Sequence, residues 1–265
     1  VLRLAAGEIT APRGGAIDLA GSTMLIEELR RGASLAEFDF AIDGPLEAVG
    51  AVLAGPPVNL MAESRIAAAD LARGRARVLA ELDFPLQRQI AREDIRFRAA
   101  GTLNDVTSET LLEGRVLSAE RLELSLSEEV VALAGRAALD GVPMTGRWSQ
   151  ALGPGADGVS RAEARVTVSD ENLRRLGVGL PPGLLSGAGA VDAQLALRPG
   201  VAPDLTLSSD LAGLALSLPT LGWSLPEVQT GRLDAQVSLG AVPRVEALDL
   251  QAAGLALQGR VDLVP

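Results

Sequence analysis

Apolar and polar side chains alternate along most of this sequence, and the alternation restricts the chain to strands with one dry and one wet face. The clearest stretch is RLELSLS at 121–127, where Leu122, Leu124 and Leu126 alternate with charged or hydroxyl residues. Successive side chains of a strand point to opposite faces of a sheet, so these leucines share a face. The pattern recurs at 36–42, 76–84, 162–168, 191–197, 205–207, 214–218, 233–239 and 255–263. The sequence therefore predicts a long series of amphipathic strands.

Turn signals separate these strands at regular intervals. Glycine and proline gather at 152–155, 179–183, 198–200 and 240–243, and helical patterns are rare between them. Strands with this spacing indicate a mainly β, antiparallel meander and not βαβ units. The segment TMLIEEL at 23–29 is also interpreted as a strand because it lies within this series.

Two short helices are expected within the series of strands. DGPLEAVGAVLAG at 43–55 places Pro45 at a first helical position, with Asp43 or Gly44 as the cap, and Gly-Pro-Pro follows. SDENLRRLG at 169–177 offers Ser169 or Asp170 as a cap and ends on Gly177.

An approximate repeat of 41 residues lies within 190–260. Asp-Ala-Gln at 192–194 matches 234–236, and Gly-Leu-Ala-Leu at 213–216 matches 254–257. A period between 20 and 50 residues is typical of stacked arrays. The repeated unit is predicted to be strand, turn, strand, turn, strand, so all of 1–265 is expected to form a single elongated segment.

Composition removes several classes of function. Cysteine and histidine are absent, which excludes disulfides, thiolate metal sites and the usual histidine-based catalysis. The formal net charge of −10 argues against nucleic-acid binding, which relies on clustered cations. Neighbouring carboxylates at 93–94, 128–129 and 170–171 have no ligand-like spacing and are interpreted as solvated strand ends or caps. We therefore expect no enzyme activity, no cofactor and no metal.

Any apolar surface of this chain must be aliphatic. Apolar residues make up 48% of the sequence but aromatic residues only 2%. Trp148 and Trp223 each follow a glycine-containing turn, and we expect each of them to close the end of a core more readily than to anchor a ligand or a membrane.

The ends of the sequence lead us to expect a piece of a longer protein. The chain begins at Val1 and contains neither an apolar run of 18 residues nor a signal-peptide pattern. An anchor or address is expected in the rest of that protein.

Three stretches resemble the AsmA-like superfamily of the bacterial envelope, and most of all its large YhdP-type branch, relatives of TamB. They are FDFAIDGPLEAVGAVLAGPPVNL at 38–60, ELDFPL at 81–86 with EDIRFRAAGTLNDV at 93–106, and VSDENLRRLGVGLPPGLLSGAGAVDAQLAL at 168–197. The resemblance implies a long twisted antiparallel sheet folded into an open, taco-like groove. It also implies an inner-membrane anchor elsewhere in the protein and transfer of phospholipid across the periplasm to the outer membrane.

The resemblance further implies that the apolar strand faces line a lipid groove. The residues expected to line it are Phe38, Phe40, Ile42, Val78, Leu82, Leu122, Leu124, Leu126, Val166, Val168, Leu195, Leu197, Leu205, Leu207, Val237, Leu239, Leu255 and Leu257. Phospholipids are then the partners, and the protein partners are unknown. The alternative is a structural β-sandwich or solenoid spacer whose apolar faces bury each other and bind no ligand.

Overall fold

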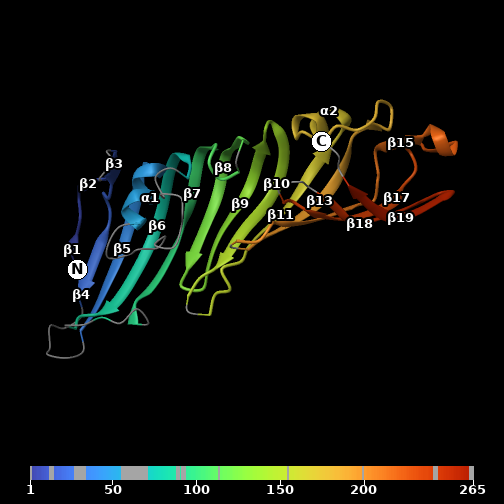
Figure 1. Cartoon of the computed structure of the whole chain (residues 1–265). Helices are drawn as coiled ribbons and strands as arrows, with labels where there is room; N and C mark the ends of the chain where they lie inside the picture. The colour runs from blue at the N-terminus through green and yellow to red at the C-terminus, as the bar shows by residue number, and fades with distance from the viewer. Residues whose placement is uncertain are drawn as a thin grey trace. The chain divides into compact units, whose positions relative to one another are not determined.

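The computed structural model of the chain consists mainly of β-strands (Figure 1). It describes residues 2–11, 15–26, 34–54, 71–87, 90, 94–112, 114–153, 155–198, 200–240 and 244–262.

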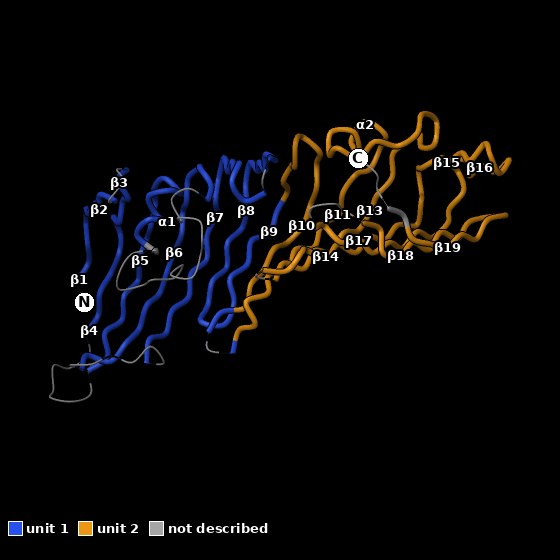
Figure 2. The backbone as a smooth tube through the Cα atoms, in the orientation of Figure 1, with its two compact units in different colours: residues 1–135, 152–155 blue, residues 136–151, 156–265 orange. Residues whose placement is uncertain are grey.

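The chain divides into two compact units (Figure 2). Unit 1 is Val1–Gly135 with Leu152–Gly155, and unit 2 is Arg136–Ala151 with Ala156–Pro265. A single segment was expected from the uniform strand pattern, whereas contacts within the fold separate these two units. The alternation of side chains predicts which face of a strand each residue occupies, but it does not predict where the chain divides into separate units.

Unit 1 contains the first eight strands, the first part of the ninth, and a helix. Its elements are β1 (Leu2–Arg3), β2 (Glu8–Thr10), β3 (Ala16–Asp18), β4 (Thr23–Ile26), β5 (Leu35–Pro45), α1 (Leu46–Ala54), β6 (Arg73–Pro85), β7 (Arg96–Ser108), β8 (Leu117–Ser127) and β9 (Val130–Leu139). The predicted strand at 23–29 corresponds to β4 as far as Ile26, and its remaining residues lie outside the described ranges.

Unit 2 contains the end of β9 and all later elements. They are β10 (Val142–Ala151), β11 (Ser160–Val168), α2 (Asp170–Arg175), β12 (Leu185–Gly187), β13 (Gly189–Leu197), β14 (Asp204–Ser209), β15 (Leu214–Leu218), a 3-10 turn at Pro219–Leu221, β16 (Trp223–Leu225), β17 (Gly231–Ser238), β18 (Arg244–Ala252) and β19 (Leu255–Asp262).

Sixteen of these strands form one open antiparallel sheet. Its main order is β1-β4-β5-β6-β7-β8-β9-β10-β11-β13-β14-β17-β18-β19, with β3 also paired to β5 and β2 to β3. Most neighbours in the sheet are also neighbours in the sequence, which defines a meander. The predicted mainly β antiparallel meander with one or two short helices is confirmed.

Helix α1 starts later than the sequence suggested. Strand β5 continues through Pro45, which lies opposite Arg75 of β6, and the helix begins at Leu46. The predicted cap residues, Asp43 and Gly44, therefore belong to β5 and are paired with β6. Proline is tolerated at a strand end because no backbone N–H is needed there.

Helix α2 lies within the predicted range and is capped as expected. The Ser169 hydroxyl accepts a hydrogen bond from the Asn172 N–H at 3.2 Å. The side chains of Asp170 and Glu171 form ion pairs with Arg174 and Arg175 one turn later. These acidic residues thus stabilise a helix start, as the interpretation of them as cap residues predicted.

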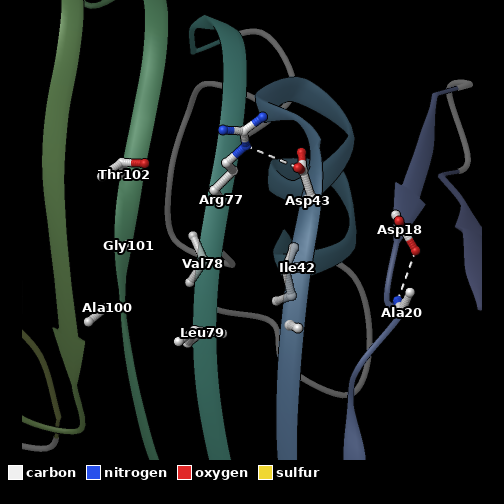
Figure 3. A pocket seen from close by; sticks show the side chains of 11 residues that line it. Asp18, Ala20, Ile42, Asp43, Arg77, Val78, Leu79, Ala100, Gly101 and Thr102 are labelled. Atoms are coloured by element: carbon white, nitrogen blue, oxygen red, sulfur yellow. Dashed lines mark hydrogen bonds and ion pairs between the residues drawn. The ribbon is translucent and has the colours of Figure 1, made fainter. Parts of the chain in front are cut away.

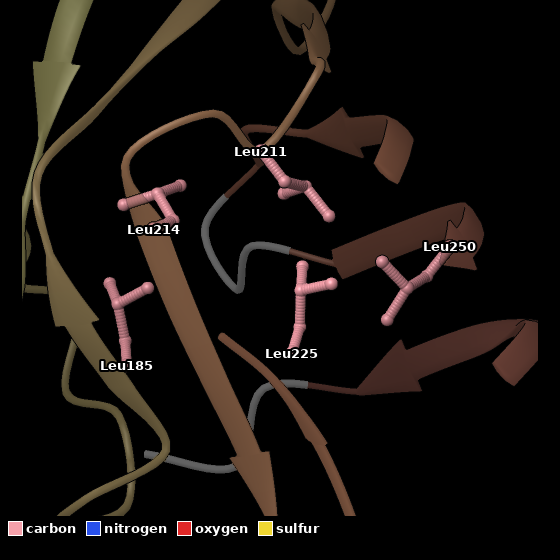
Figure 4. Packing of buried hydrophobic residues seen from close by; sticks show 5 residues of the cluster. All are labelled: Leu185, Leu211, Leu214, Leu225 and Leu250. Atoms are coloured by element: carbon pink, nitrogen blue, oxygen red, sulfur yellow. The ribbon is translucent and has the colours of Figure 1, made fainter. Parts of the chain in front are cut away.

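A second, three-stranded sheet of order β12-β15-β16 packs onto the main sheet in unit 2. We call it the cover sheet. Leucines from both sheets and from the connection between β14 and β15 form a cluster in which no side chain is more than 8% exposed (Figure 4). Its members are Leu185, Leu211, Leu214, Leu225 and Leu250.

The two copies of the sequence repeat end differently. In the second copy, β18 and β19 are joined by residues 253–254 and remain paired, as expected for a tight hairpin. In the first copy, residues 210–213 join β14 to β15, and β15 leaves the main sheet for the cover sheet. Leu211 in this longer connection has a φ of 58° and is 1% exposed. Burial of Leu211 in the cluster offsets its unfavourable backbone conformation.

We expect Leu225→Ala to destabilise unit 2 by about 2–5 kcal/mol, because it leaves a cavity in the leucine cluster. Leu225 is 1% exposed, whereas Leu221 in the adjacent turn is 61% exposed. The matched variant Leu221→Ala should stay within about 0.5 kcal/mol of the parent. Urea unfolding followed by tryptophan fluorescence measures both, and equal losses would contradict the assignment of Leu225 to a core.

Candidate functional site

The cross-strand register of unit 1 places the predicted lining residues on one face of the sheet. Phe38 lies opposite Leu82, and Ile42 lies opposite Val78. On the next pair of strands, Leu124 lies opposite Gly101. All eight lining residues predicted in this unit share the face, namely Phe38, Phe40, Ile42, Val78, Leu82, Leu122, Leu124 and Leu126. We call this the apolar face of unit 1.

Unit 2 has an equivalent apolar face. Leu195 lies opposite both Ala162 of β11 and Leu205 of β14, and Leu205 lies opposite Val237 of β17. The predicted residues on this face are Val166, Val168, Leu195, Leu197, Leu205, Leu207, Val237, Leu255 and Leu257. Leu239 follows the end of β17, where its N–H donates to the Pro203 carbonyl, and it is 36% exposed.

Side chains on the two apolar faces are mostly half-buried. Phe38, Leu124 and Leu195 are typical, whereas Val78 is buried at 7% exposure. A half-buried side chain packs sideways against its neighbours and still presents surface to a ligand or to water. These faces therefore retain accessible apolar surface.

Charged side chains lie on the opposite face of the described strand pairs. In unit 1 the Asp43 carboxylate pairs with Arg75 and Arg77 at 2.6 and 3.0 Å, and Glu81 pairs with Arg98 at 2.5 Å. In unit 2, Arg165 pairs with Asp192 at 3.3 Å. At the apolar-face positions fixed by the described registers of β5–β8 there is no charged residue. The apolar face can therefore hold hydrocarbon without burying a charge beneath it.

Two arginines set the protonation of Asp43. Burial raises the pKa of its carboxyl group, but hydrogen bonds from Arg75 and Arg77 and their positive charges outweigh that effect. The pKa of Asp43 is therefore lowered from its ordinary value of 3.8, and the carboxylate stays charged beside the two guanidinium groups.

An open depression on the charged face of unit 1 was not predicted from the sequence. It has a volume of about 350 Å³, and Ala41, Leu79 and Ala100 are among its lining residues. Figure 3 shows the ion pair of Asp43 and Arg77 beside Leu79 and Ala100. Leu79 is 70% exposed. The sequence contains one sign of this depression: Leu79 lies between Arg77 and Glu81 on a side of the strand that is otherwise charged. The polar lining of the depression consists of Asp18, Thr102 and the Asp43–Arg77 ion pair.

Two glycines on the apolar faces allow close approach of the neighbouring strand. A Cβ on Gly101 would lie 2.1 Å from the Arg77 carbonyl oxygen, and one on Gly146 would lie 2.3 Å from that of Glu163. A side chain at either position would overlap the backbone of the adjacent strand. The absence of a side chain at these two positions therefore permits the observed strand pairing.

Aromatic residues are concentrated on the apolar faces. Phe38 stacks on Phe40 and on Phe84, with ring centroids 5.7 and 5.6 Å apart. Trp148 of β10 is half-buried opposite Ala162 on the apolar face of unit 2. Trp223 instead packs against the leucine cluster, and its indole N–H donates to the Ala253 carbonyl at 2.9 Å. Trp223 is thus a partly buried residue at the border of a core, in agreement with the expectation that it closes the end of one, while Trp148 lies among the predicted lining residues.

Three predicted lining residues serve the protein's own core. Val168, Leu255 and Leu257 pack against the leucine cluster of unit 2. Their surface is at least partly used in holding the cover sheet. We therefore restrict the candidate site to the rest of the two apolar faces.

Three of the acidic residues considered in the sequence have structural partners. Glu128 accepts a hydrogen bond from the Phe97 N–H at 3.0 Å, and Asp170 and Glu171 stabilise α2. Glu93 lies outside the described residues. Over the described ranges, no three acidic side chains gather closely enough to hold a metal ion.

Comparisons of the chain with protein-family models, with curated proteins and with solved structures found no match. Among the residues that the structure describes, no helix combines the length and apolar character needed to cross a bilayer.

Gly101→Ala should destabilise unit 1 by roughly 1–3 kcal/mol, because the new methyl group overlaps the backbone of β6. Gly179 has no atom within 4 Å of the corresponding Cβ position. Gly179→Ala is therefore the matched control and should change stability by less than about 0.5 kcal/mol. Chemical denaturation followed by circular dichroism measures both, and a neutral Gly101→Ala would show that the close approach is unimportant.

Asp43→Asn should lower the unfolding free energy at neutral pH by about 0.5 kcal/mol, since the ion pairs of Asp43 are largely exposed. The pKa of Asp43 is lowered on folding, so its contribution is complete above 3.8 and is lost as the pH falls below that value. Urea unfolding of parent and variant across this range should converge in acid. A difference that persists in acid would exclude the charge as its cause.

Proposed function

We propose that this chain is a lipid transfer module that shields phospholipid acyl chains on the apolar faces of its sheet. The observation that carries the proposal is the pair of uncharged, half-buried aliphatic faces fixed by the strand registers of the two units. Hydrocarbon chains are the ligands that such a surface accommodates without polar contacts. The parent protein is proposed to be anchored in the inner membrane and to act in the periplasm, between the inner and outer membranes.

The free energy of exposing a lipid to water explains why such a module is needed. Two acyl chains of about 16 carbons cost roughly 25 kcal/mol to hydrate, at about 0.8 kcal/mol per methylene. A lipid that leaves a bilayer unaided must overcome most of this cost. An apolar face that covers the chains along the way lowers the barrier.

The chemistry of the two faces suits transfer better than storage. Leucine, valine, alanine and phenylalanine make non-directional contacts, so neighbouring positions hold an acyl chain with similar strength. Directional hydrogen bonds would retain the lipid at one place. A face composed almost wholly of such residues lets a chain slide from strand to strand.

The resemblance to the AsmA-like superfamily supports the cellular part of the proposal. The stretches that carry it fall on β5, α1, β6 and β7 of unit 1 and on α2, β12 and β13 of unit 2. Both apolar faces thus include strands from these stretches.

A structural spacer is the second candidate. The leucine cluster of unit 2 favours it, because two layers there bury each other as in a sandwich. The cluster involves only part of unit 2, and the half-buried faces elsewhere remain to be explained. A spacer would bind no lipid on those faces.

Photo-crosslinking distinguishes the two candidates. Benzoylphenylalanine in place of Leu124, Val166 or Leu195 should label phospholipid when the protein is incubated with vesicles, because these residues are on the apolar faces. The same probe at Glu123 or Arg165, on the opposite face, is the matched control and should label severalfold less. Equal labelling at both sets, or none at either, would exclude lipid transfer along the apolar faces.

A further inference from the structure

The cover sheet occupies one end of the apolar face of unit 2, at the start of β17 and β19 and at the end of β11 and β18. Leu185, Leu214 and Leu225 of the cover sheet pack with Leu250 of β18 (Figure 4). Partly buried apolar residues of the main sheet pack against this contact, namely Val168, Leu233, Ala252, Leu255 and Leu257. Protein side chains therefore fill the space that an acyl chain would need above this end of the face.

Polar contacts attach the cover sheet at its borders. The Gly231 N–H at the start of β17 donates to the Asp210 carbonyl at 2.9 Å. The Ala188 N–H donates to the Gly213 carbonyl at 2.9 Å, and the indole of Trp223 donates to the Ala253 carbonyl beside β19. Opening the cover would break these bonds and also expose the leucine cluster to water.

The rest of the apolar face is not covered by the cluster. Leu205 and Leu207 of β14, Leu195 of β13 and Trp148 of β10 lie on the same face, are half-buried, and do not belong to the leucine cluster or to the residues packed against it. Val237 of β17 is likewise half-buried and outside this group. The boundary between covered and accessible surface therefore crosses the strands, with Val168 and Leu233 on the covered side.

We infer that the cover sheet is a fixed stop that closes one end of the apolar face of unit 2, over Val168 of β11 and over the ends of β17, β18 and β19 at the leucine cluster. It confines acyl chains in unit 2 to the rest of that face. The inference rests on the proposed function and says which part of the face is available to lipid. An acyl chain that slides along the accessible part meets the packed leucine cluster at the covered end.

The two tryptophans of the chain provide a direct test. Trp148 lies on the accessible part of the face, and Trp223 lies in the cover sheet. The variants Trp223→Phe and Trp148→Phe each leave one of them as the only fluorophore. Phosphatidylcholine vesicles with brominated acyl chains are the probe, and unbrominated vesicles are the control, because bromine quenches only indoles that it closely approaches.

Bromine should quench Trp148 in the Trp223→Phe variant severalfold more than it quenches Trp223 in the Trp148→Phe variant. Strong quenching of Trp223 would overturn the inference, because lipid would then reach the covered end of the face. If neither tryptophan is quenched, the proposed lipid binding itself fails. The two failures are thus distinguishable.

A loosened cover gives a second measurement. Leu225→Ser in the Trp148→Phe background should open the leucine cluster and make Trp223 accessible to brominated chains. If this variant does not fold, the comparison of the two single-tryptophan proteins decides by itself. If it folds and Trp223 stays unquenched while Trp148 in its own background is quenched, packing of the cover sheet is not what excludes lipid, and the inference is wrong.

Discussion

Each strand of the main sheet meets its neighbour through backbone hydrogen bonds in a fixed register, and the faces of the sheet depend on that register. A shift by one residue would exchange the apolar and the charged side of a strand. Two irregularities preserve the apolar face. Beside Gly74 the register of β6 and β7 shifts, so that Leu103 and Val106 are both buried although their spacing is odd. A similar shift in β18 keeps Val245 and Leu248 on one face.

The accessible apolar surface is costly for a protein that stays in water. Soluble monomers rarely expose large contiguous apolar patches, because such surfaces associate. The charged face does not add to this apolar surface, because its arginines and carboxylates pair across strands and remain hydrated. The apolar face has no such pairs at the positions fixed by the registers of β5–β8. The proposed acyl-chain ligand would cover this aliphatic, uncharged surface.

Alternation of side chains predicted the strands and their faces because a period of two follows directly from strand geometry. It predicted that Leu124 and Leu195 each share a face with apolar residues of their neighbouring strands. The cap residue Ser169 predicted where α2 begins. Features that depend on contacts between distant residues were missed. The start of α1 depends on pairing of Pro45 with β6, and the exposure of Leu79 depends on small neighbours from two other strands. Neither is visible in a local pattern.

The repeat in unit 2 shows most clearly where local reasoning ends. The sequence Gly-Leu-Ala-Leu begins one residue before both β15 and β19 and forms the start of each strand, with the same alternation and the same aliphatic residues. A two-residue connection keeps β19 beside β18, whereas the longer connection 210–213 sends β15 into the cover sheet. Identical side chains therefore extend an apolar face in one case and cover it in the other. The longer loop, with Leu211 buried within it, accompanies the departure of β15 from the main sheet.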